Sequence, residues 1–180
     1  MSDEVIPYLA GTQEFAAVCG VAPQQVSLWV KRGHIDYSNA VIISGKAYWP
    51  LAEARRHAGA PDEAALKAVI AEQEHGRWAD DVSEVPPLVG LQEIAELLHV
   101  TRIQAGAMYR SKGQLGEADR RVSGAPLWLL DRFVADVVPA LREKSRTKDW
   151  VVDAEVEAAI RERRYEGPGS CILPRGRAAK

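Results

Sequence analysis

The stretch VAPQQVSLWVKRG, at residues 21–33, carries polar side chains at a spacing suited to recognising the edge of a flat polar partner. Gln24, Ser27 and Lys31 fall at i, i+3 and i+7, and Leu28 is at i+4, so a helix would present all four on one face. A glutamine amide can form two parallel hydrogen bonds with adenine, and an aliphatic side chain can contact a thymine methyl group. A lysine near the end of such a helix suits a phosphate.

Capping and turn residues predict the helices that would position this face. A short helix is expected over residues 12–18, followed by a glycine-containing turn at 19–20. A second helix is expected to begin near Ala22, because Pro23 suits a first helical turn, and to end at Gly33. The positions expected to be buried on this second helix are Val26, Trp29 and Val30.

The next elements are predicted to be a β-hairpin and a third helix. In AVIISGKAYW, two runs rich in β-branched and aromatic residues flank Ser44-Gly45, a pair typical of a tight turn. Pro50 then opens a predicted helix with the sequence LAEARRHA. The predicted order of helix, turn, helix, hairpin and helix is that of a winged helix-turn-helix domain.

The same pattern recurs later in the chain, where Leu9 aligns with Leu88 at an offset of 79 residues. One residue is then inserted in the second copy, and the offset of 79 returns beyond it. Because identities, apolar positions and turn residues all match, we predict two copies of one structural unit. The identical pairs include Gly11/Gly90, Gln13/Gln92, Glu14/Glu93, Ala16/Ala95, Val21/Val100, Ser44/Ser123, Gly45/Gly124 and Trp49/Trp128.

The second copy differs from the first at its second helix. Thr101 and Gln104 form a predicted capping box there, and a hairpin is expected from about Asp119 to Trp128, with a helix near Leu130. Ala105, Met108 and Tyr109 take the positions expected to be buried. The positions expected to face outward are Ile103, Gly106, Ala107 and Arg110. This face is mostly apolar, which fits either thymine methyl groups or a protein partner, and Gly106 is expected to allow a close backbone approach.

The two blocks together, about 100 residues, resemble the MerR-like and phage-excisionase winged helix-turn-helix families. The resemblance rests on EFAAVCGVAPQQVSLWVKRGHI and SGKAYWP in the first copy, and on EIAELLHVTRIQA and SGAPLW in the second. It implies a mainly α fold with small β-hairpin wings, arranged as tandem winged helix-turn-helix domains. It also implies that the second helices enter the major groove of DNA while the wings contact the backbone or minor groove. MerR regulators normally continue into a long dimerising helix, whereas the segment after the first copy here is predicted to be a helix of only about fourteen residues, from Pro61 to Glu74.

Under this interpretation the DNA-binding residues lie on the two second helices, their ends and the two wings. The predicted contacts are Gln24, Gln25, Ser27, Leu28, Lys31, Arg32, Lys46, Thr101, Arg102, Ile103, Gln104, Arg110, Lys112, Arg120 and Arg121. The basic residues among them suit phosphates, whereas the glutamines and aliphatic side chains suit bases.

Charge and turn signals divide the chain into four segments. They are a first domain over residues 1–59, an acidic helix and linker over 60–87, a second domain over 88–143, and a C-terminal basic segment, helix and tail over 144–180. The linker carries seven acidic and two basic residues, so it is expected to face away from DNA. In the last segment, Arg161, Arg163 and Arg164 either solubilise a surface helix, contact phosphates or mediate dimers, and PRGRAAK is expected to be a disordered basic tail.

Composition and residue spacing argue against several classes of function. The net charge of −2 does not exclude nucleic acid, because binding depends on local basic clusters rather than on the total. The two cysteines and four histidines show no metal-ligand spacing, no cofactor or small-molecule motif is present, and GPGS at 167–170 lacks the strand and lysine of a phosphate loop. We therefore expect no enzyme activity. The absence of a long apolar run or signal peptide predicts a cytoplasmic, nucleoid-associated protein.

The leading hypothesis is a sequence-specific binder of double-stranded DNA, a transcription regulator that reads an asymmetric or direct-repeat site of two parts. An architectural protein of the excisionase or packaging type, from a phage or mobile element, is one alternative. A protein-interaction adaptor built on degenerate helix-turn-helix units is another. A homodimer through the middle or C-terminal helix is a further expectation.

Overall fold

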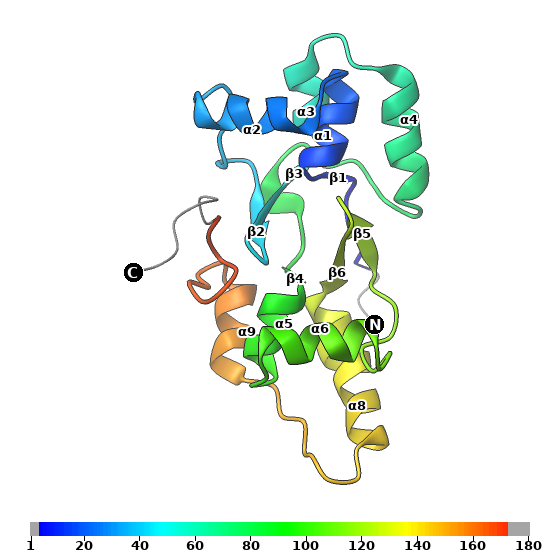
Figure 1. The fold of residues 1–180 in the computed structure, drawn as a ribbon, viewed down its shortest axis with the longest axis vertical. Coiled ribbons are helices and arrows are strands. Elements are labelled where there is room, and N and C mark those ends of the chain that lie inside the picture. Colours follow the sequence, from blue (N-terminus) through cyan, green and yellow to red (C-terminus); the bar gives the residue numbers. More distant parts are fainter. Residues whose placement is uncertain (1–3, 173–180) are drawn as a thin grey trace.

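The computed structural model describes residues 4–172, so the expected basic tail lies outside the described residues. Over these residues the chain is mainly helical and holds two small antiparallel sheets of three strands each. The sheets lie in the middle of an elongated molecule, with helices at either end (Figure 1). The mainly helical class with small hairpins agrees with the sequence.

One end of the molecule is built by the first copy of the repeat, which we call the N-terminal unit. It consists of β1 (Leu9–Ala10), α1 (Thr12–Cys19), α2 (Pro23–Lys31), β2 (Val41–Ile43), β3 (Lys46–Pro50), α3 (Leu51–Ala58) and α4 (Glu63–Glu72). Its sheet has the order β1-β3-β2, because the short β1 joins the far side of the predicted hairpin. The expected helices are confirmed: Gly20 ends α1 with a φ of 68°, and Pro23 occupies the first turn of α2.

The hairpin turn of this unit is tight and left-handed. Ile43 pairs with Lys46, and the two residues between them, Ser44 and Gly45, have φ values of 49° and 74°. Two consecutive positive φ values define the type I′ turn, whose twist matches that of the flanking strands. The turn therefore follows from the Ser-Gly pair, and it recurs at Ser123-Gly124 with φ values of 48° and 75°.

The second copy and the chain that follows it form the other end, the C-terminal unit. It consists of β4 (Leu88–Val89), α5 (Leu91–Leu97), α6 (Arg102–Arg110), β5 (Arg120–Val122), β6 (Ala125–Leu129), α7 (Leu130–Arg132), η2 (Phe133–Val137), α8 (Val138–Lys144) and α9 (Ala154–Arg161). Its sheet order, β4-β6-β5, repeats that of the first unit. α7, the π-helical turn η2 and α8 follow one another without a break.

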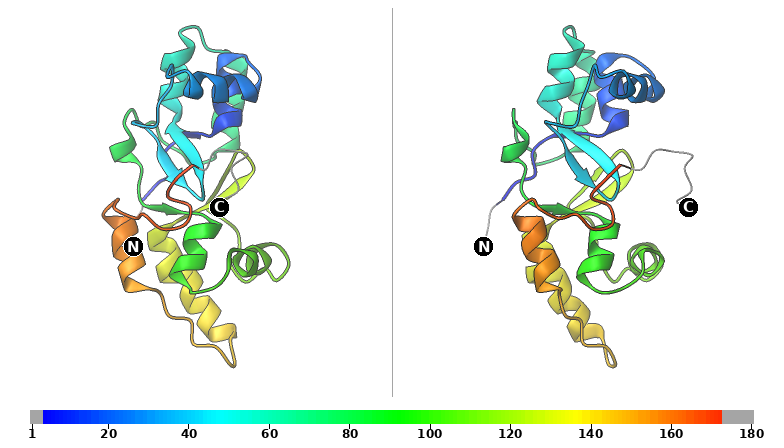
Figure 2. Two further views of the ribbon diagram at one scale, coloured as in Figure 1. Left: turned by 60° about the vertical axis from the view of Figure 1, so that its left-hand side comes forward. Right: turned by 90° about the vertical axis from the view of Figure 1, so that its left-hand side faces the viewer.

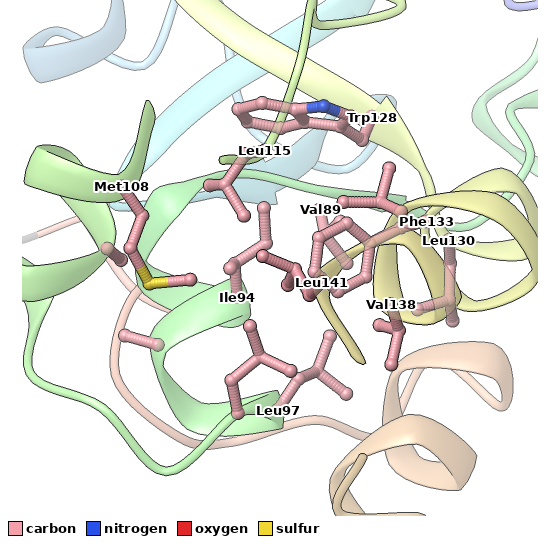
Figure 3. Packing of buried hydrophobic residues seen from close by; sticks show 14 of the residues in the cluster. Val89, Ile94, Leu97, Met108, Leu115, Trp128, Leu130, Phe133, Val138 and Leu141 are labelled. Atoms are coloured by element: carbon pink, nitrogen blue, oxygen red, sulfur yellow. The ribbon is translucent and has the colours of Figure 1, made fainter. Parts of the chain in front are cut away.

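The core of the C-terminal unit extends beyond the expected boundary at residue 143. Trp128, Phe133 and Leu97 are fully buried at its centre, where β6, α5 and the α7–α8 segment meet (Figure 3). Trp150 and Ile160 belong to the same buried cluster. The C-terminal helix is therefore part of the unit, because its apolar stripe packs on α5 instead of facing solvent.

The middle segment is not a free linker. Leu66 and Val69 of α4 are buried in the core of the N-terminal unit. Gln73, at the end of α4, is only 3% exposed, and its amide both donates to the backbone carbonyl of Leu9 and accepts from the Leu9 N–H. The short helix η1 (Val82–Glu84) follows, and Val85 is buried. The apolar face of the middle helix is thus covered within the chain.

A third buried cluster joins the two units. It combines residues of both sheets with the segments that lead into them, namely Ile6, Leu9, Ile43, Tyr48, Val85, Leu88, Val122 and Leu127. Burial of an aliphatic side chain of this size stabilises a fold by about 1.5 to 3 kcal/mol. The two copies therefore share a core and form one body, in contrast to the tethered domains that the sequence predicted. Among the described residues, no helix is long and apolar enough to cross a membrane.

Candidate nucleic-acid interface

The polar face predicted for the second helix of the first copy is exposed. Val26 of α2 is buried, and Trp29 is half-buried with its ring 4.8 Å from the His57 ring, so the opposite side turns outward. Gln24 and Leu28 lie on that outward side, and Leu28 is 40% exposed. No hydrogen bond or ion pair within the described chain engages the outward side chains of Gln24, Ser27 and Lys31.

The second helix of the second copy begins as expected. The Thr101 hydroxyl accepts a hydrogen bond from the Gln104 N–H at 3.1 Å, and the Gln104 side chain accepts from the Thr101 N–H at 2.8 Å. This capping box fixes the start of α6 and turns Arg102 and Ile103 outward. Ile103 is 85% exposed, the highest value of any large apolar side chain in the described chain. Nothing in the fold requires an isoleucine there.

The structure corrects the expectation for Gly106. This glycine is buried by the side chain of Arg110, one turn later on the same helix, and no other backbone approaches it closely. The outward face of α6 is therefore formed by Arg102, Ile103 and Arg110, with Ala107 half-buried beside them.

Gly106→Ala is expected to raise the free energy of unfolding by about 1 kcal/mol, because glycine is disfavoured by that amount in a helix interior. A Cβ at this position would lie 2.9 Å from a guanidinium nitrogen of Arg110, which is the flexible end of a side chain and can move aside. Urea denaturation followed by tryptophan fluorescence measures the change. A clear loss of stability would show that the packing of Arg110 over residue 106 is rigid.

Helices α2 and α6 lie on the same face of the molecule and run in opposite directions. In Figure 1 they extend to opposite sides of the molecular axis. In the right-hand view of Figure 2 both are seen nearly end-on along one edge, while α9 and η1 lie toward the other. The two units are thus related by an approximate twofold axis that passes between the sheets.

The tip of each hairpin contacts the first helix of the opposite unit. The Ser44 N–H donates to one carboxylate oxygen of Glu93 at 2.7 Å, and the Ser44 hydroxyl donates to the other at 2.6 Å. The same hydroxyl accepts from the Gln92 N–H at 3.1 Å. Glu93 also accepts from the Gly90 N–H at 3.0 Å, so one carboxylate caps its own helix, α5, and holds the hairpin tip of the other unit.

The reciprocal contact uses the matching residues of the repeat. The Ser123 N–H donates to Glu14 at 2.7 Å, the Ser123 hydroxyl donates to the second carboxylate oxygen, and the Gln13 N–H donates to the Ser123 hydroxyl at 3.2 Å. Glu14 accepts from the Gly11 N–H at 3.1 Å. We call these two arrangements the serine clamps. Both hairpin tips thus contact the protein itself, contrary to the expectation that the wings contact DNA.

The two serine clamps differ in burial. Glu93 is 3% exposed, and this burial raises the pKa of its carboxyl group. The carbonyl of Gly169 accepts from the Gly45 N–H at 2.9 Å, so the C-terminal segment covers this clamp. Glu14 is half-buried. Burial, together with the nearby carboxylates of Glu14 and Glu93, also raises the pKa of Tyr48, which lies in the shared core.

Arg120 lies in the hairpin as predicted, but its side chain is buried, which corrects its assignment as a DNA contact. It is 8% exposed, and its guanidinium donates to the carbonyls of Pro7 at 2.7 Å and Ile6 at 3.0 Å and to the Gln73 side chain at 3.0 Å. Burial lowers its pKa. Its neighbour Arg121 points to the other side of β5 and is exposed, because successive residues of a strand alternate between faces.

The other predicted contact residues are accessible, except that Gln25 is half-buried. The exposed ones are Gln24, Ser27, Leu28, Lys31, Arg32, Lys46, Thr101, Arg102, Ile103, Gln104, Arg110, Lys112 and Arg121. The two second helices place most of them on one face, whereas Lys46 and Arg121 flank the hairpin tips that form the clamps.

The arginines of the C-terminal helix are engaged within the protein. Arg161 pairs with Asp131 and Glu157, and Arg164 pairs with Glu162. Arg163 donates to the backbone carbonyls of Val82, Ser83 and Val85 at 3.0, 3.1 and 2.6 Å. The contacts of Arg163 tie the turn after α9 to the middle segment, and the Arg161–Asp131 pair ties α9 to α7. Together they favour a structural role over the alternative of phosphate contact.

Contacts between the clamp residues were not predicted from the sequence, although the sequence contains a signal for them. Gly11, Gln13, Glu14 and Ser44 are identical in both copies, whereas the outward residues of the second helices are not. Identity at a turn and a helix start is expected when each copy must supply both halves of a reciprocal contact.

Within residues 4–172, no group of three or more histidine, cysteine or acidic side chains is placed to hold a metal ion. Comparison with protein-family models, curated proteins and solved structures finds no match to this chain.

Proposed function

We propose that the chain is a sequence-specific double-stranded DNA-binding protein, and a transcription regulator, built from two winged helix-turn-helix units. The observation that carries the proposal is the placement of α2 and α6 on one face with exposed polar, basic and apolar side chains, most of which form no hydrogen bond or ion pair with the rest of the described chain. Helix-turn-helix proteins place the outward residues of their second helix against base edges in the major groove. The likeness to the MerR-like and excisionase families supports the same interpretation.

The two helices present different side chains to the bases. α2 presents Gln24, which suits adenine, and Leu28, which suits a thymine methyl group. α6 presents Ile103 between Arg102 and Arg110, which suits a thymine methyl group flanked by guanines or phosphates. Since the hairpin tips are engaged in the serine clamps, phosphate contacts in this proposal come from the helix ends, at Lys31, Arg32 and Lys112 in particular.

Gel shift of the full chain against random-sequence duplex, at low and at moderate salt, tests the proposal. Binding at low salt that weakens steeply as salt rises is expected, because cationic side chains release counterions from DNA. Failure to bind any duplex at low salt would overturn it. The exposed Ile103 also suits an apolar protein partner, and that outcome would favour the adaptor function instead.

Gln24→Ala is expected to relax base preference at one position of the bound sequence by about 1 to 3 kcal/mol. Lys31→Ala, in the last turn of α2, is expected to weaken binding to all sequences alike and to reduce the salt slope by about one unit. Competition binding with single-base variants of a selected duplex separates the two effects. Lys67→Ala on the exposed side of α4 serves as the control and should change neither quantity. If Gln24→Ala and Lys31→Ala behave alike, the division into base and phosphate contacts is wrong.

Ile103→Asn is expected to leave the free energy of unfolding within about 0.5 kcal/mol of the parent value, because exposed substitutions away from packing rarely change it more. Affinity for a selected duplex should nevertheless fall, since the asparagine removes an apolar contact with a thymine methyl group. Thermal denaturation and fluorescence anisotropy measure the two quantities. Unchanged affinity would remove α6 from the DNA interface.

A further inference from the structure

We infer that the chain recognises two non-identical half-sites in inverted orientation at one fixed separation, and that the serine clamps act as the positioning contacts that set this separation. The inference rests on the proposed DNA binding and specifies the class of DNA sequence that it requires. It differs from the asymmetric or direct-repeat arrangement that a flexible tandem chain would favour.

The orientation of the half-sites follows from the relation between the units. Two identical domains on a flexible linker can bind in the same direction along DNA, which favours direct repeats. Here α2 and α6 run in opposite directions on one face, related by an approximate twofold axis (Figures 1 and 2). Protein twofold symmetry is matched by inverted half-sites on DNA, because the duplex backbone has twofold axes of its own.

The distance between the two units is fixed because they pack directly on each other and the segment between them is also packed. Leu88 and Val122 of one unit pack with Ile43 and Tyr48 of the other in the shared core. Arg120 reaches from β5 of the C-terminal unit to the carbonyls of Ile6 and Pro7 at the start of the chain. The middle segment packs on the N-terminal unit, so it cannot extend to let the units move apart.

The serine clamps connect this shared core to the two DNA-facing helices. Glu14 lies in the first turn of α1, which packs directly on α2, and Glu93 has the same place in α5, which packs on α6. Each clamp therefore holds the first helix of one unit against the hairpin of the other, close to the helix that faces DNA. Loss of both clamps would leave the shared apolar core in place but remove the hydrogen bonds that fix the angle between the two units.

The half-sites are inferred to differ in sequence because the outward residues differ. The first unit places Gln24 where the second places Ile103, and Lys31 is matched by Arg110. The exposed Ser27 is matched by the buried Gly106, so it has no outward counterpart on α6. The clamp residues are identical in the two copies, whereas the outward residues of α2 and α6 differ. The two copies therefore share the geometry by which they are held together, but they are expected to bind half-sites of different sequence.

The first experiment selects bound duplexes from a random library with the full chain and then varies the spacer between the two recovered half-sites. Inserting about 5 bp, half a helical turn, should lower affinity by about 100-fold, because the second half-site moves to the opposite side of the duplex and bivalent binding is lost. Reversing one half-site to make a direct repeat should have a similar effect. A change of less than about threefold in both cases would overturn the inference, whereas the absence of any bound duplex would instead overturn the proposed function.

The second experiment loosens the clamps with the double variant Ser44→Ala and Ser123→Ala. Affinity for a single half-site should stay within about twofold, while the penalty for inserting or deleting 1 bp should shrink by about tenfold, because the units can then rotate to reach the shifted half-site. Ser83→Ala, an exposed serine on η1, is the matched control and should keep the full penalty. Circular dichroism verifies that the double variant is folded. Ser44→Gly with Ser123→Gly, which removes the same hydroxyls at positions whose positive φ suits glycine, provides a second version should it fail. A spacing penalty unchanged in a folded clamp variant would show that the clamps do not set the separation.

Discussion

Arg120→Ala is expected to lower the free energy of unfolding by about 3 to 5 kcal/mol, the range of a disrupted buried polar network. The substitution removes one guanidinium that donates to two backbone carbonyls and to the Gln73 side chain, all buried at the junction of the units. The two carbonyls left without a partner each carry a desolvation penalty of about 1 to 3 kcal/mol. The Gln73 side chain keeps its hydrogen bond from the Leu9 N–H.

Arg121→Ala is the matched control, since it removes the same side chain one residue away. Arg121 is exposed and makes one hydrogen bond, to the carbonyl of Gly124 at 3.2 Å, so stability should change by less than about 0.5 kcal/mol. Urea denaturation by tryptophan fluorescence compares the two variants. If Arg120→Ala is as stable as Arg121→Ala but binds DNA more weakly, then Arg120 acts at the DNA surface and the inward placement of its guanidinium is wrong.

Gly90→Ala is expected to lower the free energy of unfolding by about 1 to 3 kcal/mol, the usual cost of overpacking a well-packed site. A Cβ at this position would overlap the Ser44 hydroxyl and lie 3.2 Å from both the Ser44 Cβ and the Ile43 methyl group. The hairpin tip would have to retreat, which breaks its hydrogen bonds with Glu93. Backbone strain plays no part, because Gly90 has a φ of −113° that alanine adopts readily.

The repeat provides a second instance of this prediction. A Cβ on Gly11 would overlap the Ser123 hydroxyl and lie 2.9 Å from its Cβ, so Gly11→Ala should also destabilise the chain. Gly106→Ala is the control with the opposite expected sign, because there the added methyl group meets only the flexible end of Arg110. Thermal denaturation of the three variants decides the matter. If Gly90→Ala and Gly11→Ala were both as stable as the parent, the hairpin tips would not be in close contact with the first residues of α5 and α1.

Local elements could be predicted closely because their signals are local. Pro23, Gly33 and the Thr101–Gln104 capping box act within one turn of helix, and the Ser-Gly pairs determine a turn of two residues. The buried stripes of the second helices follow from helical periodicity in the same way. The strands β1 and β4 were not predicted, because two residues are too few to show an alternating pattern.

The sequence by itself determined the helices, the hairpins, the duplication and the outward face of α2, because each depends on residues close together in the chain. On α6 it misplaced Gly106, which is buried under Arg110. Only the tertiary structure decided where the repeated residues act. Ser44 meets Glu93 across 49 residues and Ser123 meets Glu14 across 109, and no local pattern encodes such partners. The same reason separates Arg120 from Arg121, since strand alternation places neighbours on opposite faces and only the packing of the two units decides which face is buried.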